Sequence, residues 1–129
     1  MLRFGYTAAY VPDVEATLVF YERAFGLERR FVTPGGSYGE LETGETALAF
    51  AALTLGQAQF PGGIRPIALD EAPPALEIAL VSDDVATAFA RAVEAGATPL
   101  TEPAEKPWGQ TVAFVRDLNG LLIELCTPI

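Results

Sequence analysis

Apolar and polar positions follow the same order of patterns twice along the chain. Each copy opens with a short apolar segment typical of a strand, from Tyr6 in the first copy and from Glu77 in the second. An Asp-Val pair stands seven residues after each start, at Asp13 and Asp84. Apolar residues then recur at the spacing of a helix, at Val14, Leu18, Tyr21 and Phe25 in the first copy and at Val85, Phe89 and Ala92 in the second. The patterns predict a strand followed by a helix, twice.

Both predicted helices carry matching start and stop signals. An aspartate side chain accepts hydrogen bonds from the free N–H groups of a first helical turn, so Asp13 and Asp84 are predicted to be caps and not catalytic residues. Gly26 and Gly96 suit the left-handed conformation that commonly ends a helix. We therefore expect one helix to end at each glycine.

Strand-like segments separated by turn residues follow each helix. They are predicted at residues 27–34, 37–43 and 46–53 in the first copy and at 97–103, 110–117 and 120–128 in the second, with Asn119-Gly120 as a hairpin signal. Each copy is therefore a β-α-β-β-β module, over about 4–53 and about 75–128, and residues 54–74, rich in Gly and Pro, are predicted to link them. Because neither module could comfortably bury a core alone, we expect one α+β domain over residues 1–129.

Composition narrows the range of partners. The 129 residues carry a formal net charge of −9, and the basic residues form no patch, which argues against nucleic acid. An acidic surface favours small cationic or neutral ligands. The chain shows no apolar run long enough to span a membrane and no leader pattern, so we expect a cytoplasmic protein without a membrane partner.

The chain contains no histidine. Histidine is the commonest general base and the usual imidazole ligand of zinc, nickel and iron, and it activates serine and cysteine nucleophiles. Its single cysteine, Cys126, excludes an internal disulfide and a cysteine-rich zinc site, and we expect it to be a small buried side chain. Carboxylates, phenols, amides and the backbone must supply whatever chemistry the protein performs.

One carboxylate stands inside an apolar strand pattern near the end of the chain. Glu124 is surrounded in the sequence by Leu121, Leu122, Ile123 and Leu125. Burying an unpaired charge costs several kcal/mol or more, so a buried carboxylate is normally neutralised, paired or bound to something. Glu124 is therefore the first candidate for a functional residue, although a structural role, accepting hydrogen bonds from the backbone or Tyr6, is the alternative.

The two modules, with "VPDVEATLVFYERAFGLE" at 11–28 and "PWGQTVAFVRDLNGLLIEL" at 107–125, resemble the vicinal oxygen chelate superfamily. This group includes glyoxalase I, bleomycin-resistance proteins, extradiol dioxygenases and fosfomycin-resistance enzymes. The resemblance implies two tandem βαβββ modules that form a cup-shaped mixed sheet with helices on the convex side. It also implies a homodimer, whose modules pair within one chain or are exchanged between two.

The resemblance places candidate site residues on the first and last strands of each module, where the metal-dependent members hold their ligands. The matching positions are Tyr6, Leu48, Glu77 and Glu124, with Leu48 assigned by aligning Gly44 with Gly120. Leucine cannot coordinate a metal, and two carboxylates without imidazole make a weak site. We therefore expect no metal or other cofactor. The alternative is one divalent metal ion, such as Mg²⁺ or Mn²⁺, on Glu77 and Glu124.

Without a metal, two neighbouring carboxylates raise one another's pKa and attract a cation. Aromatic side chains near them would add cation–π contacts. The predicted ligand-binding residues are Tyr6, Tyr38, Leu48, Phe50, Glu77, Trp108, Phe114 and Glu124. The resulting hypothesis is a metal-independent protein that binds an aromatic or cationic small molecule in the cup between modules, as drug-sequestering relatives do.

Other interpretations stay open. The chain could be a lyase, isomerase or dioxygenase-like enzyme that uses Glu124 as a metal ligand or general base with Glu77 as its partner. Glu77 could instead face solvent, and Phe50 and Phe114 could be core residues, as aromatic residues in strands usually are. Trp108, between a proline and a glycine, is expected on a loop at the mouth of the cup.

Overall fold

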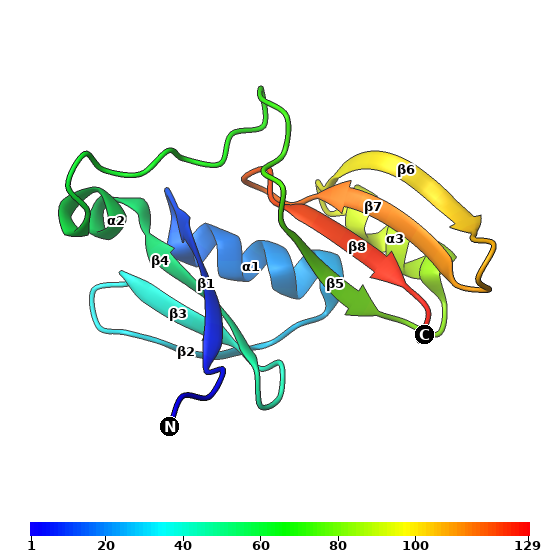
Figure 1. The fold of residues 1–129 in the computed structure, drawn as a ribbon, viewed down its shortest axis with the longest axis horizontal. Coiled ribbons are helices and arrows are strands. Elements are labelled where there is room, and N and C mark those ends of the chain that lie inside the picture. Colours follow the sequence, from blue (N-terminus) through cyan, green and yellow to red (C-terminus); the bar gives the residue numbers. More distant parts are fainter. The chain divides into compact units, whose positions relative to one another are not determined.

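The computed structural model describes residues 1–129 and contains two β-α-β-β-β modules (Figure 1). Two compact units divide the chain, residues 1–22 with 26–66 and residues 23–25 with 67–129, and we call them module one and module two. The α+β fold predicted from the sequence is confirmed. None of its helices has the length and apolar character needed to cross a membrane.

Module one contains one mixed sheet with strand order β1-β4-β3-β2. The first and last strands, β1 and β4, run parallel, and the other pairs are antiparallel. Its elements are β1 (Tyr6–Val11), α1 (Val14–Phe25), β2 (Arg29–Val32), β3 (Tyr38–Leu41), β4 (Ala47–Ala52) and α2 (Leu53–Gln59).

Module two repeats this topology with strand order β5-β8-β7-β6. Strand β5 runs parallel to β8, and β7 pairs antiparallel with both β8 and β6. Its elements are β5 (Glu77–Val81), α3 (Val85–Glu94), β6 (Thr98–Glu105), β7 (Thr111–Arg116) and β8 (Leu122–Cys126). Helix α3 lies on one face of this sheet (Figure 1), and the other face is called the open face below.

The helix ends form as the sequence predicts. Asp13 Oδ1 accepts a hydrogen bond from Ala16 N at 2.9 Å, and Asp84 Oδ1 accepts one from Thr87 N at 3.1 Å. Each bond satisfies a backbone donor of the first turn that has no partner within the helix. Gly26 and Gly96 end the helices with φ of 69° and 109°, in the region that glycine enters without strain.

The core of each module lies between its helix and one face of its sheet. In module one the ring of Phe50 packs against Tyr21 of α1, with ring centroids 4.8 Å apart. Strand β3 approaches α1 closely at Gly39, where an added Cβ would stand 2.8 Å from Leu18 Cδ1. In module two, Ile123 is fully buried. The opposite face of each sheet carries polar and aromatic side chains, together with buried residues such as Ala49 and Cys126.

The segment predicted as a linker, residues 54–74, has more structure than the sequence pattern indicates. It begins with most of α2, where Gly56 lets the helix approach Tyr10 of β1 closely. Residues 67–71, which we call the strap, are bound by a buried arginine. Arg116 donates hydrogen bonds to the carbonyl oxygens of Ala68, Leu69 and Glu71 at 2.8–3.1 Å. Composition alone could not show these contacts, because they come from residues distant in the sequence.

Candidate functional site

Strand alternation places Glu124 on the open face of module two. Its neighbours in β8, Ile123 and Leu125, are buried on the opposite, helix-facing side. In the β5–β8 pair, Ala79 stands opposite Glu124. Glu77 lies two residues before Ala79 in β5, so its side chain is on the same face of the sheet as that of Glu124. Across β7 and β8, Phe114 is directly opposite Glu124. The structure thus brings Glu77, Phe114 and Glu124 to one face of one sheet.

Two ionisable groups beside Glu124 have raised pKa values. Desolvation of the carboxyl group, together with the hydrogen bond and charge of Glu124, raises the pKa of Glu77 above the ordinary 4.5, although Glu77 as a whole residue is exposed to solvent. Burial is the main cause that raises the pKa of the Cys126 thiol to about 11, and the hydrogen bond and charge of Glu124 add to it. Cys126 is therefore a protonated, buried thiol at neutral pH. No lysine or arginine side chain forms an ion pair with Glu77 or Glu124, so a cation from outside the chain would meet no competitor.

Metal ligation is poorly matched to these residues. No group of three or more His, Cys, Asp or Glu side chains is arranged to hold a metal ion. Glu77 and Glu124 offer carboxylate oxygens, but Cys126 has its pKa raised to about 11 and keeps its proton. A divalent ion such as Mg²⁺ or Ca²⁺ takes six or more oxygen ligands, most of which would have to be water. The residues present do not fit the metal centre of the metal-dependent enzymes.

Trp108 lies on the turn between β6 and β7, and 67% of it is exposed. Its indole Nε1 donates a hydrogen bond to Gln110 Oε1 at 2.8 Å. The amide of Gln110 in turn donates to the carbonyl oxygen of Thr127 at 2.9 Å, just beyond the end of β8. Trp108 is therefore an exposed aromatic side chain in a fixed position at one end of β8.

The open face of module one presents aromatic residues. The register places Tyr6 opposite Ala47, and Tyr38 opposite Ala51, on the same side of β4. The rings of Tyr6 and Tyr38 meet edge to face, with centroids 6.1 Å apart and planes at 74°. Two of the predicted aromatic residues are thus neighbours across strands that are far apart in the sequence.

The structure corrects the predictions for Leu48 and Phe50. Both are buried on the helix-facing side of β4 and do not share a face with Tyr6. Ala49 stands opposite Ala8 in β1, as Glu124 stands opposite Ala79 in β5, so Ala49 is the counterpart of Glu124. Four residues separate Gly44 from Ala49, whereas three separate Gly120 from Glu124, so aligning the two glycines shifted the match by one residue. A one-residue shift moves every side chain to the other face of the sheet.

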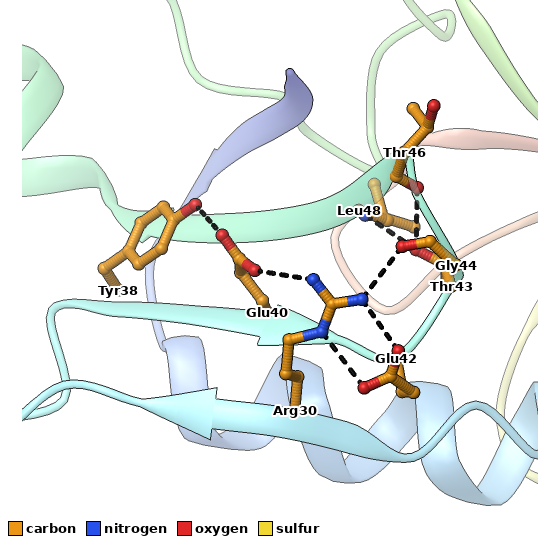
Figure 2. A network of polar contacts seen from close by, with 8 residues as sticks. All are labelled: Arg30, Tyr38, Glu40, Glu42, Thr43, Gly44, Thr46 and Leu48. Carbon is orange, nitrogen blue, oxygen red and sulfur yellow. Dashed lines mark hydrogen bonds and ion pairs between the residues drawn. The ribbon is translucent and has the colours of Figure 1, made fainter.

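Sequence analysis missed a polar network that surrounds Tyr38 (Figure 2). Tyr38 Oη donates a hydrogen bond to Glu40 Oε2 at 2.7 Å, and Arg30 Nη1 lies 3.5 Å from Glu40 Oε1. Arg30 also forms an ion pair with Glu42 at 2.7 Å and donates to the carbonyl oxygen of Gly44 at 2.9 Å. Burial and the adjacent Glu40 raise the pKa of Tyr38, so the phenol stays neutral. The alternation of Tyr38 and Glu40 along one strand was the only signal in the sequence.

Comparison with known proteins gives a consistent result for the fold. A family model described as the Glyoxalase/Bleomycin resistance protein/Dioxygenase superfamily matches residues 3–125. A search of curated proteins found no match. Among solved structures, a glyoxalase-related enzyme from Fulvimarina pelagi is 21% identical, with a TM-score of 0.80, over 99% of this chain and 89% of that one.

Two further solved structures have the same fold at similar sequence distance. TioX from Micromonospora sp. ML1 is 21% identical, with a TM-score of 0.73, over 98% of this chain and 99% of that one. A superfamily member from Sphaerobacter thermophilus is also 21% identical, with a TM-score of 0.73, over 99% of this chain and 98% of that one. At this identity the structural likeness establishes the fold and leaves the ligand to be argued from the side chains.

Proposed function

The chain belongs to the glyoxalase/bleomycin resistance protein/dioxygenase superfamily, and we propose that it is a metal-independent protein that binds a small organic cation at Glu77 and Glu124. The observation that carries this proposal is the pair of neighbouring carboxylates on the open face of module two, with no lysine or arginine paired to them. A bound cation would neutralise charge that the protein itself leaves uncompensated.

The surroundings of the pair favour an arylalkyl amine. An ammonium group offers N–H donors to both carboxylates, and charge-assisted hydrogen bonds of this kind are about twice as strong as neutral ones. Phe114, directly across from Glu124, presents a ring to the cation or to an apolar part of the ligand. We propose that the protein retains such a ligand unchanged, which is sequestration and not turnover.

Proton competition gives the binding a defined pH dependence. The pKa of Glu77 is raised, so lowering the pH toward that value protonates Glu77 and removes one of the two charges. Affinity for an amine that stays positively charged should therefore fall as the pH falls through the raised pKa of Glu77.

The test is calorimetric titration of the full chain with benzylamine and phenethylamine at constant ionic strength. Glu124→Gln keeps the size of the side chain and removes its charge, and it should weaken binding about tenfold or more. Glu105→Gln makes the same charge change on β6 and serves as the matched control. Equal affinity of the wild type and Glu124→Gln, or no binding of either amine, would show that the proposal is wrong.

A second candidate is an enzyme that uses the pair in acid–base catalysis. The raised pKa of Glu77 beside a second carboxylate supports it, because general bases work best with a pKa near the working pH. Such a base would remove a proton adjacent to a carbonyl group, as glyoxalase-like lyases and isomerases do. Deuterium exchange into a panel of carbonyl compounds, lost in both Glu77→Gln and Glu124→Gln, would favour this candidate over sequestration.

Metal content distinguishes a metal-dependent enzyme from the binding protein and from a metal-independent acid–base enzyme. Elemental analysis of purified protein without a tag should find no stoichiometric Mg, Mn, Fe, Co, Ni or Zn. Near-stoichiometric metal that disappears in Glu124→Gln would contradict metal independence and make both glutamates ligands.

A further inference from the structure

Large aromatic side chains on the open face of module one remain exposed to solvent. Tyr6 is 57% exposed and Phe31 is 42% exposed, whereas Phe50 on the helix-facing side of the sheet and Tyr21 of α1 are fully buried. We call Tyr6, Phe31 and Tyr38 the aromatic cluster. Exposed apolar side chains gathered on one face commonly mark a surface that binds a ligand or partner.

The rings of the aromatic cluster are held at angles to one another. Tyr38 lies in the middle, with centroid distances of 6.1 Å to Tyr6 and 6.0 Å to Phe31. The planes meet at 74° in the first pair and at 41° in the second. Ring faces that point in different directions can contact one cation from more than one side, and the electron-rich face of an aromatic ring attracts cations.

Charge beside the cluster favours a positive ligand. The network of Arg30, Glu40 and Glu42 contains one guanidinium group and two carboxylates, which leaves one negative charge in excess. Only 13% of the Glu40 side chain is exposed, and its ion pair with Arg30 is long, at 3.5 Å. Glu42, by contrast, lies 2.7 Å from the same arginine. The weakly compensated charge is therefore that of Glu40, next to the ring of Tyr38.

The hydrogen bonds of Glu40 distinguish between classes of ammonium group. Its Oε2 atom accepts from Tyr38 Oη, and its Oε1 atom accepts from Arg30 Nη1. These two bonds leave one lone pair on each oxygen of Glu40, which is fewer acceptors than the three N–H donors of a primary ammonium group require, and the aromatic rings of the cluster present π faces in place of lone pairs. A fully alkylated ammonium group has no N–H donor, so it can use the charge of Glu40 and the ring faces without disturbing this network (Figure 2).

From these observations we infer that module one carries its own binding site for a quaternary ammonium group, formed by Tyr6, Phe31 and Tyr38 with Glu40 as the counter-ion. This site does not depend on the Glu77–Glu124 pair. It selects for alkylation of the nitrogen, whereas the pair on module two selects for N–H donors. Arg30 acts as a positioning residue, because it holds one oxygen of Glu40 while Tyr38 holds the other.

The test compares two probes on the full chain at constant ionic strength. Tetramethylammonium and methylammonium are titrated separately, and the shifts of the aromatic ring resonances are followed by NMR. Tetramethylammonium should bind more tightly and shift the resonances of Tyr6, Phe31 and Tyr38. Equal affinity for the two probes, or shifts confined to other rings, would overturn the inference.

Matched variants locate the site. Phe31→Leu should weaken tetramethylammonium binding about fivefold, the effect expected for loss of one cation–π contact. Phe60→Leu is the control, because Phe60 is also 42% exposed and also packs against a tyrosine, Tyr10, whose hydroxyl donates to the neutral Gln59. An equal loss of affinity in both phenylalanine variants would show that tetramethylammonium has no preference for the rings beside Glu40, and it would overturn the inference.

Two carboxylate variants complete the experiment. Glu40→Gln removes the counter-ion with little change of shape and should weaken tetramethylammonium binding, so it tests the inference even if Phe31→Leu folds poorly. Glu124→Gln should leave tetramethylammonium binding unchanged while it weakens amine binding at module two. Loss of tetramethylammonium binding in Glu124→Gln would place the site elsewhere and overturn the inference.

Discussion

The two modules share a topology and differ in what they present on their open faces. At matched register positions, Glu40 of β3 stands opposite Ala49 of β4, whereas Phe114 of β7 stands opposite Glu124 of β8. The carboxylate therefore lies on the third strand of one module and on the last strand of the other. In module one Tyr38 and Arg30 each hold one oxygen of Glu40, whereas module two leaves Glu124 beside a second carboxylate.

This difference shows which part of the repeat is constrained. The helix-facing sides of both sheets are apolar and buried, because each helix must cover them to form a core. The open faces carry no such requirement, so the same backbone can carry aromatic residues in one copy and paired carboxylates in the other. Chemistry in this protein is therefore a property of the open faces.

The turn before the last strand is held by an arginine in both modules, by different means. Arg30 of β2 donates to the carbonyl oxygen of Gly44 at 2.9 Å, and Arg116 of β7 donates to that of Gly120 at 3.0 Å. Arg30 is partly exposed and paired with glutamates, whereas Arg116 is buried and donates its remaining hydrogen bonds to the strap. The turn of module one is therefore held by a partly exposed arginine, and the turn of module two by a buried one.

The largest expected effect separates the two faces of module one. Phe50→Ala removes a fully buried ring that packs on Tyr21 and should lower the free energy of unfolding by about 3–5 kcal/mol. Phe31→Ala removes the same group from the open face and should cost about 1 kcal/mol or less. Urea unfolding followed by far-UV circular dichroism measures both. Similar losses in the two variants would show that the open face is also a packed core.

The second largest expected effect is the difference in the free energy of unfolding between variants of Arg116 and Arg30. Arg116→Leu leaves four carbonyl oxygens without their donor and should lower the free energy of unfolding by about 3 kcal/mol. Arg30→Leu loses exposed ion pairs that solvent screens, so it should cost much less than Arg116→Leu. The same urea experiment applies, with hydrogen exchange of the strap amides as a second measurement. Unchanged exchange in Arg116→Leu would mean that other contacts hold the strap.

The smallest expected effect is a pH dependence of opposite sign in the two modules. The pKa of Glu77 is raised, so the stability it contributes is full below about 4.5 and is lost as pH rises through the folded-state value. Glu77→Gln should therefore be more stable than the wild type at pH 7, by about 0.5 kcal/mol, and this advantage should shrink toward pH 4.

Glu42 supplies the contrast in module one. The hydrogen bond and charge of Arg30 lower the pKa of Glu42, so its contribution is present above the ordinary pKa and is lost as pH falls through the lowered value. Glu42→Gln should be less stable than the wild type at pH 7, with the difference disappearing in acid. Thermal unfolding of both variants from pH 7 down to about pH 2 measures the two trends, and trends of the same sign would contradict the assignment.

Much of the fold was predictable because its signals are local. Asp13 and Asp84 cap helices through N–H groups three residues away, and Gly26 and Gly96 end them. The candidate site was predictable in part. Glu77, Glu124 and Phe114 come together as strand alternation indicates, but Leu48 and Phe50 face the helix, and Phe31, Glu40 and Arg30 were not identified.

The sequence by itself determined the two β-α-β-β-β modules, the helix caps and the absence of imidazole, because periodicity, capping and composition depend only on residues close in the chain or on their count. Only the tertiary structure decided which face each strand residue occupies. Side chains along a strand alternate with a period of two, so the one extra residue between Gly44 and Ala49, compared with Gly120 and Glu124, puts Ala49 and not Leu48 at the position that matches Glu124. The aromatic cluster likewise exists only because pairing brings β1, β2 and β3 into one sheet, where distant tyrosines and a phenylalanine become neighbours.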